Sequence, residues 1–148
     1  RSSAASDVYK RQGVVRELPE REAIVAHVAA NSDDGDTVLV WGNFPEIYWD
    51  AERAPAAGFV SMDFVTGRTP SRDNDASTIA DAPDRGLSHL MTSITEEPPA
   101  LVVDTHPAAI RDYEHYPMSL FPEVEAFVDA HYGEPVDVGG VLVYELIG

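Results

Sequence analysis

The 148-residue chain contains no cysteine, and Lys10 is its only lysine. Without cysteine, a disulfide framework and any metal site built on thiolates are excluded. No stretch approaches the roughly 18 consecutive apolar residues of a membrane-spanning helix, so none is predicted in the sequence as it stands. Basic residues are scarce as well, because 10 lysines and arginines accompany 26 acidic residues and give a formal net charge of -16. Such a charge repels phosphates and excludes a general nucleic-acid-binding role.

Short motifs that carry chemistry are also missing. The sequence has no G-x-S-x-G nucleophile motif, no phosphate-binding P-loop and no G-x-G-x-x-G dinucleotide motif. The acidic turn Asp33-Asp34-Gly35-Asp36 lacks the downstream glutamate that completes a calcium loop. We therefore predict no catalytic residue, no metal ligand and no cofactor within this chain.

The chain does contain enough apolar side chains for a core. Its hydrophobic fraction is 44%, which argues against wholesale disorder, and its length fits one domain. Residues 2–12 (SSAASDVYKRQ) differ from the rest in having no helical or strand period, and they resemble a translated sequencing adaptor. We interpret residues 1–12 as a non-native or disordered tail, Gly13 as the start of a sequenced fragment, and residues 13–148 as a single α/β domain.

The charge of the domain is more extreme than that of the whole chain. Setting aside Asp7 among the acids and Arg1, Lys10 and Arg11 among the bases leaves a formal net charge of -18 and no lysine in residues 13–148. Two explanations remain open. One is a halophile, in which salt screens the repulsion between acidic side chains, and the other is a GC-rich genome, which disfavours lysine codons.

The hydrophobic pattern alternates between helical and strand periods. Helices are predicted at 19–30, 46–52 and 83–95, with a short helical turn at 108–112 and a last helix from Pro122 to before Gly133. Strands are predicted at 37–41, 59–65 and 100–104, and Gly139-Gly140 joins a hairpin of 136–138 with 141–146. The polar segment Thr66–Asp75 is predicted to be the most mobile loop. The predicted central strand residues are Val38, Leu39, Val40, Leu101, Val102, Val103, Leu142 and Val143. The helix residues predicted to cover them are Leu87, Leu90, Ile94, Val124, Phe127 and Val128.

This order of elements predicts an α/β fold. We expect a three-layer sandwich with a mostly parallel sheet and the C-terminal antiparallel hairpin at its edge.

Ligands of such sheets bind beyond the carboxyl ends of the strands, which defines a candidate contact rim here. Its predicted residues are Trp41, Asn43, Glu46, Tyr48, Asp104 and His106. Asp104 and His106 could act as an acid/base pair or bind a metal, but a turn cap next to an exposed histidine explains them more simply. Trp41, Tyr48 and Trp49 could stack on a sugar, although packing is the commoner role of such aromatics. We interpret Asp112, Glu114, His115 and Tyr116 as a solvated loop.

Several motifs between Val38 and Leu146 resemble one family. They are Val40-Trp41-Gly42-Asn43-Phe44-Pro45-Glu46-Ile47-Tyr48, the strand Pro98 to Asp104, the aromatic helix Phe121 to Tyr132, and the strand Val141 to Tyr144. In this order they resemble the soluble C-terminal domain of multispanning membrane glycosyltransferases that use polyprenyl- or dolichyl-phosphate-linked sugars. These enzymes form the superfamily of protein mannosyltransferases and aminoarabinose transferases.

The resemblance implies a role and a location. The domain would lie on the extracytoplasmic face of the membrane, next to the transmembrane part of the same polypeptide, and it could contact the acceptor substrate. The family's catalytic acids lie in an early loop between membrane helices, outside this sequence, so the fragment itself would be non-catalytic. The alternative is a free-standing α/β domain that binds or acts on a sugar or nucleotide. Apolar segments encoded upstream of codon 13 would distinguish the two.

Overall fold

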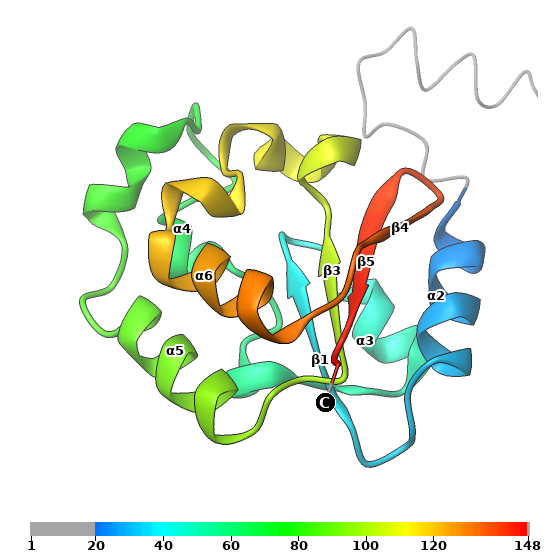
Figure 1. Cartoon of the computed structure of the whole chain (residues 1–148). Coiled ribbons are helices and arrows are strands. Elements are labelled where there is room, and N and C mark those ends of the chain that lie inside the picture. Colours follow the sequence, from blue (N-terminus) through cyan, green and yellow to red (C-terminus); the bar gives the residue numbers. More distant parts are fainter. Residues whose placement is uncertain (1–19, 148) are drawn as a thin grey trace, which may run out of the picture.

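The structure, a computed structural model, describes residues 20–147 (Figure 1). The prediction that residues 1–12 form a tail therefore lies outside the described residues. The helices are α2 (Arg21–Ala30), α3 (Glu46–Ala51), α4 (Asp63–Thr66), α5 (Gly86–Glu96) and α6 (Pro122–His131). Five 3₁₀ turns join them, η1 (Ala56–Gly58), η2 (Ala76–Asp81), η3 (His106–Ala108), η4 (Ile110–His115) and η5 (Met118–Leu120). None of the helices in this part of the chain is long and apolar enough to cross a membrane.

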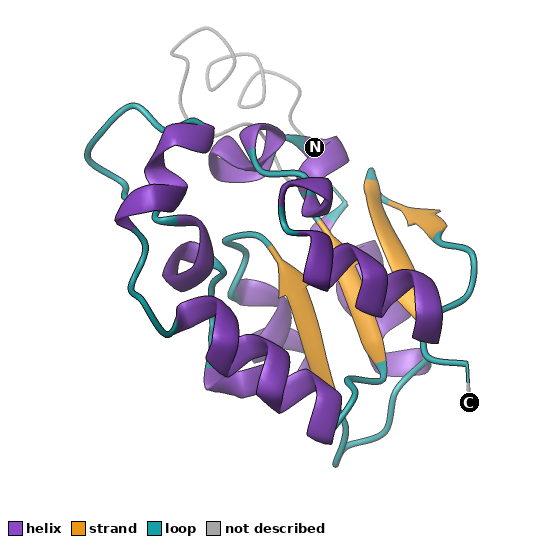
Figure 2. Ribbon diagram, turned by 60° about the vertical axis from the view of Figure 1, so that its left-hand side comes forward, coloured by secondary structure: helices purple, strands orange, loops and turns teal. Residues whose placement is uncertain are grey.

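Five strands form one mixed sheet in the order β2-β1-β3-β5-β4 (Figure 2). They are β1 (Thr37–Trp41), β2 (Ala54–Pro55), β3 (Leu101–Asp104), β4 (Val136–Val138) and β5 (Val141–Glu145). Strand β1 pairs in parallel with both β2 and β3, whereas β5 runs antiparallel to β3 and β4. The predicted α/β class and the antiparallel hairpin at the sheet edge are confirmed.

The sheet separates two apolar clusters, because successive strand side chains point to opposite faces. On one face Leu39, Trp41 and Val102 pack with residues of α5 and α6. On the other face Val38, Val40 and Val103 pack with residues of α2 and α3. Figure 1 shows these two pairs of helices on opposite sides of the strands. Of the predicted central strand and covering residues, Leu142 and Leu87 are half-buried and the others are buried, which confirms the predicted core.

The predicted strand at 59–65 is wrong. This segment instead forms a bend and the single-turn helix α4, and the buried residue Val65 of α4 lies three positions after the buried Met62 that precedes the helix. The hydroxyl of Ser61 accepts a hydrogen bond from the backbone N–H of Asp63 (3.0 Å), and Gly67 ends the helix with a left-handed φ of 76°. The strand at this edge is the two-residue β2, whose Pro55 has no N–H to donate, as is usual at sheet edges.

Candidate functional site

The carboxyl ends of β1 and β3 lie side by side, because these two strands pair in parallel. After Trp41 the chain enters α3, whose Ile47 and Tyr48 pack on one face of the sheet. After Asp104 it first packs Ala108 and Ile110 on that same face and then reaches Tyr113, Tyr116 and α6 on the other face. In open α/β sheets, ligands bind outside the carboxyl ends of neighbouring strands. We give the name β1–β3 crevice to the polar region beyond these two strand ends, and it is the first place to look for a functional site.

Backbone contacts hold the two strand ends of the crevice together. Thr105 donates to the carbonyl of Trp41 through both its backbone N–H (3.1 Å) and its hydroxyl (2.9 Å). Gly42, between the strand end and the crevice, has a φ of 150°, and a Cβ there would collide with the hydroxyl of Thr105. A residue without a side chain is therefore required at this close approach.

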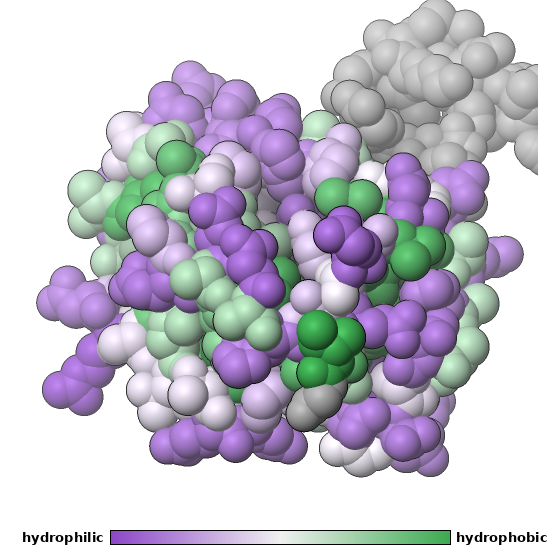
Figure 3. Space-filling model, viewed as in Figure 1, coloured by the Kyte–Doolittle hydropathy of each residue, from purple (hydrophilic) through white to green (hydrophobic). Residues whose placement is uncertain are grey.

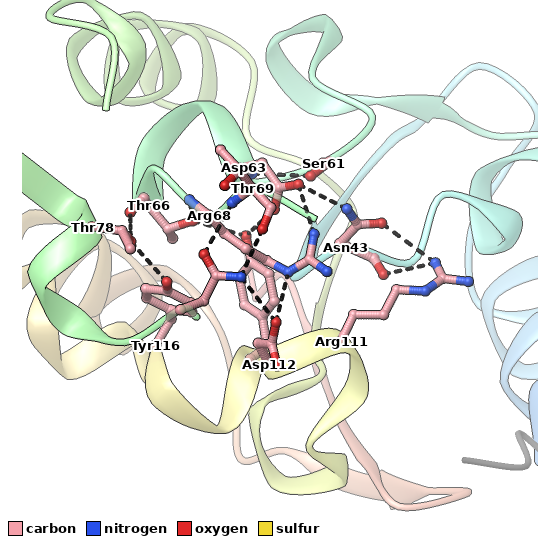
Figure 4. A network of polar contacts seen from close by, with 12 residues as sticks. Asn43, Ser61, Asp63, Thr66, Arg68, Thr69, Thr78, Arg111, Asp112 and Tyr116 are labelled. Atoms are coloured by element: carbon pink, nitrogen blue, oxygen red, sulfur yellow. Dashed lines mark hydrogen bonds and ion pairs between the residues drawn. The ribbon is translucent and has the colours of Figure 1, made fainter. Parts of the chain in front are cut away.

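The carboxylate of Asp63 is the centre of a polar network in this crevice (Figure 4). Its Oδ2 accepts hydrogen bonds from Asn43 Nδ2 (2.8 Å) and Arg68 Nη1 (3.1 Å), and its Oδ1 accepts one from the hydroxyl of Tyr113 (2.9 Å). These donors come from three distant segments of the chain, so one carboxylate ties the exit of β1 to α4 and to the η4 turn.

Arg68 continues this network into the segment predicted as the most mobile loop. Its side chain is only 9% exposed, and its Nε lies 3.6 Å from Asp112 Oδ2. Asn74 Nδ2 donates to the same Asp112 oxygen (3.1 Å) and to the carbonyl of Thr69 (2.8 Å), while Asn74 Oδ1 accepts from the N–H of Thr69 (3.0 Å). The segment is thus anchored at both Arg68 and Asn74, and these two side chains connect it to η4.

A second ion pair borders the crevice. Arg111 donates from Nη1 to Glu46 Oε1 (3.1 Å) and from Nη2 to Glu46 Oε2 (2.8 Å), and it also reaches the carbonyl of Asn43 (3.0 Å). The hydrogen bonds from Arg111 hold the pKa of Glu46 below its usual value. This bidentate pair fixes α3 against the loop that follows β3.

The loop that supplies Arg111 has an unusual backbone. Ala109, Arg111 and Asp112 have φ angles of 55°, 51° and 73°, in the left-handed region that non-glycine residues seldom occupy. Such conformations persist only where surrounding contacts impose them, and here Glu46, Asn74 and Arg68 supply those contacts. The geometry of the crevice is therefore held at some cost in backbone strain.

The six predicted rim residues do not form one surface. Asn43 and Glu46 meet at Arg111, as described above. Trp41 is 0% exposed, with its Nε1 donating to the carbonyl of Tyr116 (2.8 Å). The hydroxyl of Tyr48 is buried and accepts from the N–H of Val40 (2.8 Å), and burial raises the pKa of this phenol. Both aromatic side chains thus take the packing role rather than that of a sugar-stacking platform.

Asp104 lies on the side of β3 that faces α6, and His106 follows it in the η3 turn. Asp104 Oδ1 accepts a hydrogen bond from the backbone N–H of His106 (3.0 Å), which is the turn-cap arrangement. Asp104 is buried, and this burial raises the pKa of its carboxyl group. The half-buried His106 directs only its backbone, not its ring, to that carboxylate.

Sequence reasoning missed the residues at the centre of the network, Asp63, Arg68 and Arg111. The interpretation of 112–116 as a solvated loop was wrong for Tyr116, which is fully buried with its hydroxyl 2.7 Å from that of Thr78. One sequence signal could have indicated these arginines. Arginines are scarce in this acidic chain, so each is expected to pair with one of the many carboxylates. Which carboxylates pair with each arginine depends on the folded loops.

In the crevice two arginines, Arg68 and Arg111, face the three carboxylates of Asp63, Asp112 and Glu46. Within residues 20–147, no group of three or more histidines or carboxylates is arranged to hold a metal ion. Comparisons of the chain with protein-family models, with curated proteins and with solved structures find no match. The site must therefore be interpreted from its own geometry.

Proposed function

We propose that this chain is the outer, non-catalytic domain of a membrane glycosyltransferase that uses a polyprenyl-phosphate-linked sugar. In this proposal the domain lies on the extracytoplasmic face of the membrane and packs on the transmembrane part of the same polypeptide. The sugar-transfer chemistry belongs to that membrane part. The domain contributes a rigid surface beside it.

The observation that carries the proposal is the structural use of the motif that resembles the family. Trp41 binds the backbone of Tyr116, Gly42 makes room for Thr105, and the hydroxyl of Tyr48 caps the backbone of Val40. The aromatic helix at 121–132 ends on Tyr132, whose hydroxyl donates to the carbonyl of Pro99 in the Pro-Pro segment before β3 (2.6 Å). Tyr48 and Tyr132 bind other motif residues, and Trp41 and Gly42 contact residues outside the motifs. These are packing roles, as expected if the motifs encode a domain fold rather than a reaction.

The layer arrangement supports the same assignment. The order of elements predicts a three-layer α/β sandwich, and two separate apolar clusters, one on each face of the sheet, are consistent with that architecture. We propose that the half-buried residues Asn43, Glu46 and His106, rather than Trp41 and Tyr48, border the surface that meets the membrane part or the acceptor. The Glu46–Arg111 pair gives that surface a fixed shape.

The proposal is tested first by the DNA upstream of codon 13 in the source genome. We expect an open reading frame, continuous with residues 13–148, that encodes several apolar segments of about 20 residues. An upstream stop codon followed by a start codon close to Gly13 would contradict the proposal and favour a free-standing domain.

A transfer assay tests directly whether the sugar-transfer activity belongs to the membrane part and not to this domain. The purified chain is incubated with polyprenyl-phosphate-linked hexose and pentose donors and with candidate acceptors, beside the full-length enzyme. We expect transfer only from the full-length enzyme. Repeated turnover by the purified chain, absent from a heat-denatured control, would show that the domain is itself an enzyme and would overturn the proposal.

A further inference from the structure

A pocket of about 170 Å³ opens on the α6 face of the sheet, between β3, β5, α6 and the η5 turn. We call it the α6 pocket. Its polar lining consists of Asp104, Ser119, Glu125, Asp129 and Tyr144, and its apolar lining of Pro117, Met118 and Val128. It shares no lining residue with the network in the β1–β3 crevice. An apolar cavity of ~150 Å³ accommodates a molecule of the size of benzene, so this pocket is large enough for a small organic group.

The α6 pocket has a strongly negative lining. Three of its residues are carboxylates, no arginine lines it, and none of the three carboxylates forms an ion pair with a residue in the described part of the chain. The effect extends to Tyr144, whose phenol pKa is raised by burial and then by the charges of Asp104, Asp129, Glu134 and Glu125. Three carboxylates, one on β3 and two on α6, thus direct a negative potential into one hollow.

Asp104 provides the second, independent observation. It is only 7% exposed, and its Oδ1 accepts a single hydrogen bond, from a backbone N–H. Its Oδ2 receives no hydrogen bond from any residue between 20 and 147, although Asp104 lines the pocket. A buried carboxylate is normally paired or fully hydrogen-bonded, because removing it from water is unfavourable. Oδ2 itself is not sealed from solvent, so in the pocket it is accessible to a donor from outside the chain.

We propose that the α6 pocket binds an organic cation, namely an ammonium or guanidinium group on a short aliphatic chain. The cationic group donates to Asp104 Oδ2, with Glu125 and Asp129 nearby to complement its charge. The aliphatic chain packs on Met118 and Val128. A cation of this kind supplies both the hydrogen bond and the counter-charge that Asp104 lacks.

Two sources present this chemistry. One is a free small amine or guanidine, and the other is a lysine or arginine side chain on a peptide. The pocket opens to solvent between α6 and η5, so both can reach it. The probes are chosen to distinguish them.

The experiment is isothermal titration of the full chain with n-butylammonium at low ionic strength, followed by the blocked peptide acetyl-Gly-Lys-Gly-amide. The neutral control is n-butanol, which has the same chain without the charge. We expect saturable binding of the cationic probe and none of n-butanol. Binding of both cationic probes assigns the pocket to basic side chains as well as free amines, and binding of n-butylammonium alone assigns it to small amines.

Asp104→Asn is the decisive variant, because asparagine keeps an oxygen for the N–H of His106 and removes the charge. We expect it to weaken n-butylammonium binding at least about tenfold. Asp84→Asn removes the same charge from an exposed residue outside the pocket and is expected to leave affinity unchanged. The double variant Glu125→Gln/Asp129→Asn alters only exposed α6 residues and is expected to weaken binding several-fold without touching the core.

Three results would overturn the proposal. They are no saturable binding of n-butylammonium by the wild-type chain, equal binding of n-butanol, or unchanged affinity in folded Asp104→Asn. If Asp104→Asn does not fold, the double variant decides, and undiminished binding in it rejects the pocket as the site.

Discussion

Asp63 and Asp104 both lie near the carboxyl edge of one sheet, Asp104 as the last residue of β3, yet their surroundings differ. Asp63 accepts hydrogen bonds from an arginine, an asparagine and a tyrosine. Asp104, although more deeply buried, accepts one backbone N–H and meets no cation in the described part of the chain. The chain has a formal net charge of -16 and few arginines, and the fold places two of them, Arg68 and Arg111, in the β1–β3 crevice.

The carboxylates of the two regions therefore have different roles. In the crevice each arginine faces a carboxylate, and the pairs join segments that are far apart in the chain, so their role is to hold the loops. In the α6 pocket the carboxylates have no internal counter-charge, so their surroundings favour an external cation. Figure 3 shows hydrophilic residues around groups of apolar ones on the face seen there.

The largest expected effect comes from breaking the crevice network at Arg68. Arg68→Met keeps much of the aliphatic bulk but leaves Asp63 and Asp112 without their cation. Because removing one partner of a buried pair strands a charge, we expect the free energy of unfolding to fall by about 3 kcal/mol. Urea denaturation followed by circular dichroism measures it.

Arg72→Met is the matched control for Arg68→Met. Arg72 pairs with Asp81 at 3.1 Å, but both side chains are exposed. We expect a change below about 1 kcal/mol, as is usual for surface pairs. Equal losses in the two variants would contradict the structural role of the crevice network.

The next effect has the opposite sign. Burial raises the pKa of Asp104 above its value in the unfolded chain, so ionisation of this group destabilises the fold. The destabilisation begins as pH rises through the unfolded-state value and is complete above the folded-state value. We therefore expect Asp104→Asn to raise the free energy of unfolding by about 1 kcal/mol at neutral pH.

A pH series sharpens the Asp104 prediction. The advantage of Asp104→Asn over the wild-type chain should shrink as pH falls through the raised folded-state pKa of Asp104, and it should be gone below the ordinary pKa of an aspartate, where the side chain is neutral in both states. Thermal unfolding between neutral and acidic pH measures this difference, with Asp84→Asn as the charge-matched control. A destabilised Asp104→Asn at neutral pH would show that the buried carboxylate is already compensated.

The smallest effect concerns Glu46. Arg111 lowers the pKa of this carboxyl group, so its stabilising contribution is present above the unfolded-state pKa and is lost as pH falls through the folded-state value. Glu46→Gln should remove this part of the acid sensitivity and lower the free energy of unfolding at neutral pH by up to about 1 kcal/mol, because the pair is partly exposed. Acid titration of unfolding in both chains tests it, and identical acid limbs would argue against the pair.

The sequence predicted the strands and helices whose signal lies in consecutive residues. The apolar runs at 38–41 and 101–103 lie in β1 and β3, which are buried on both faces. The segment 59–65 was wrongly predicted as a strand. Its buried residues Met62 and Val65 are three positions apart, which is a helical spacing. Its few residues do not distinguish a buried strand from a helical turn.

The site was less predictable for a different physical reason. Arg111 lies 65 positions from Glu46, and its placement depends on a loop with three non-glycine residues at positive φ. No local rule selects such conformations, since tertiary contacts impose them. By contrast, the capping role of Asp104 was foreseeable because the acceptor and His106 are two residues apart. Its burial and its unpaired oxygen depend on α6 and were not.

The comparison between the two regions is tested most directly by one nuclear magnetic resonance titration of the wild-type chain with n-butylammonium. Backbone amide signals report both regions at once, in the same sample. The account predicts saturable shifts at His106, Ser119 and Tyr144 around the α6 pocket, with Asn43, Asp63 and Arg68 in the crevice unchanged. Shifts centred on the crevice, or no saturable shift in either region, would contradict it.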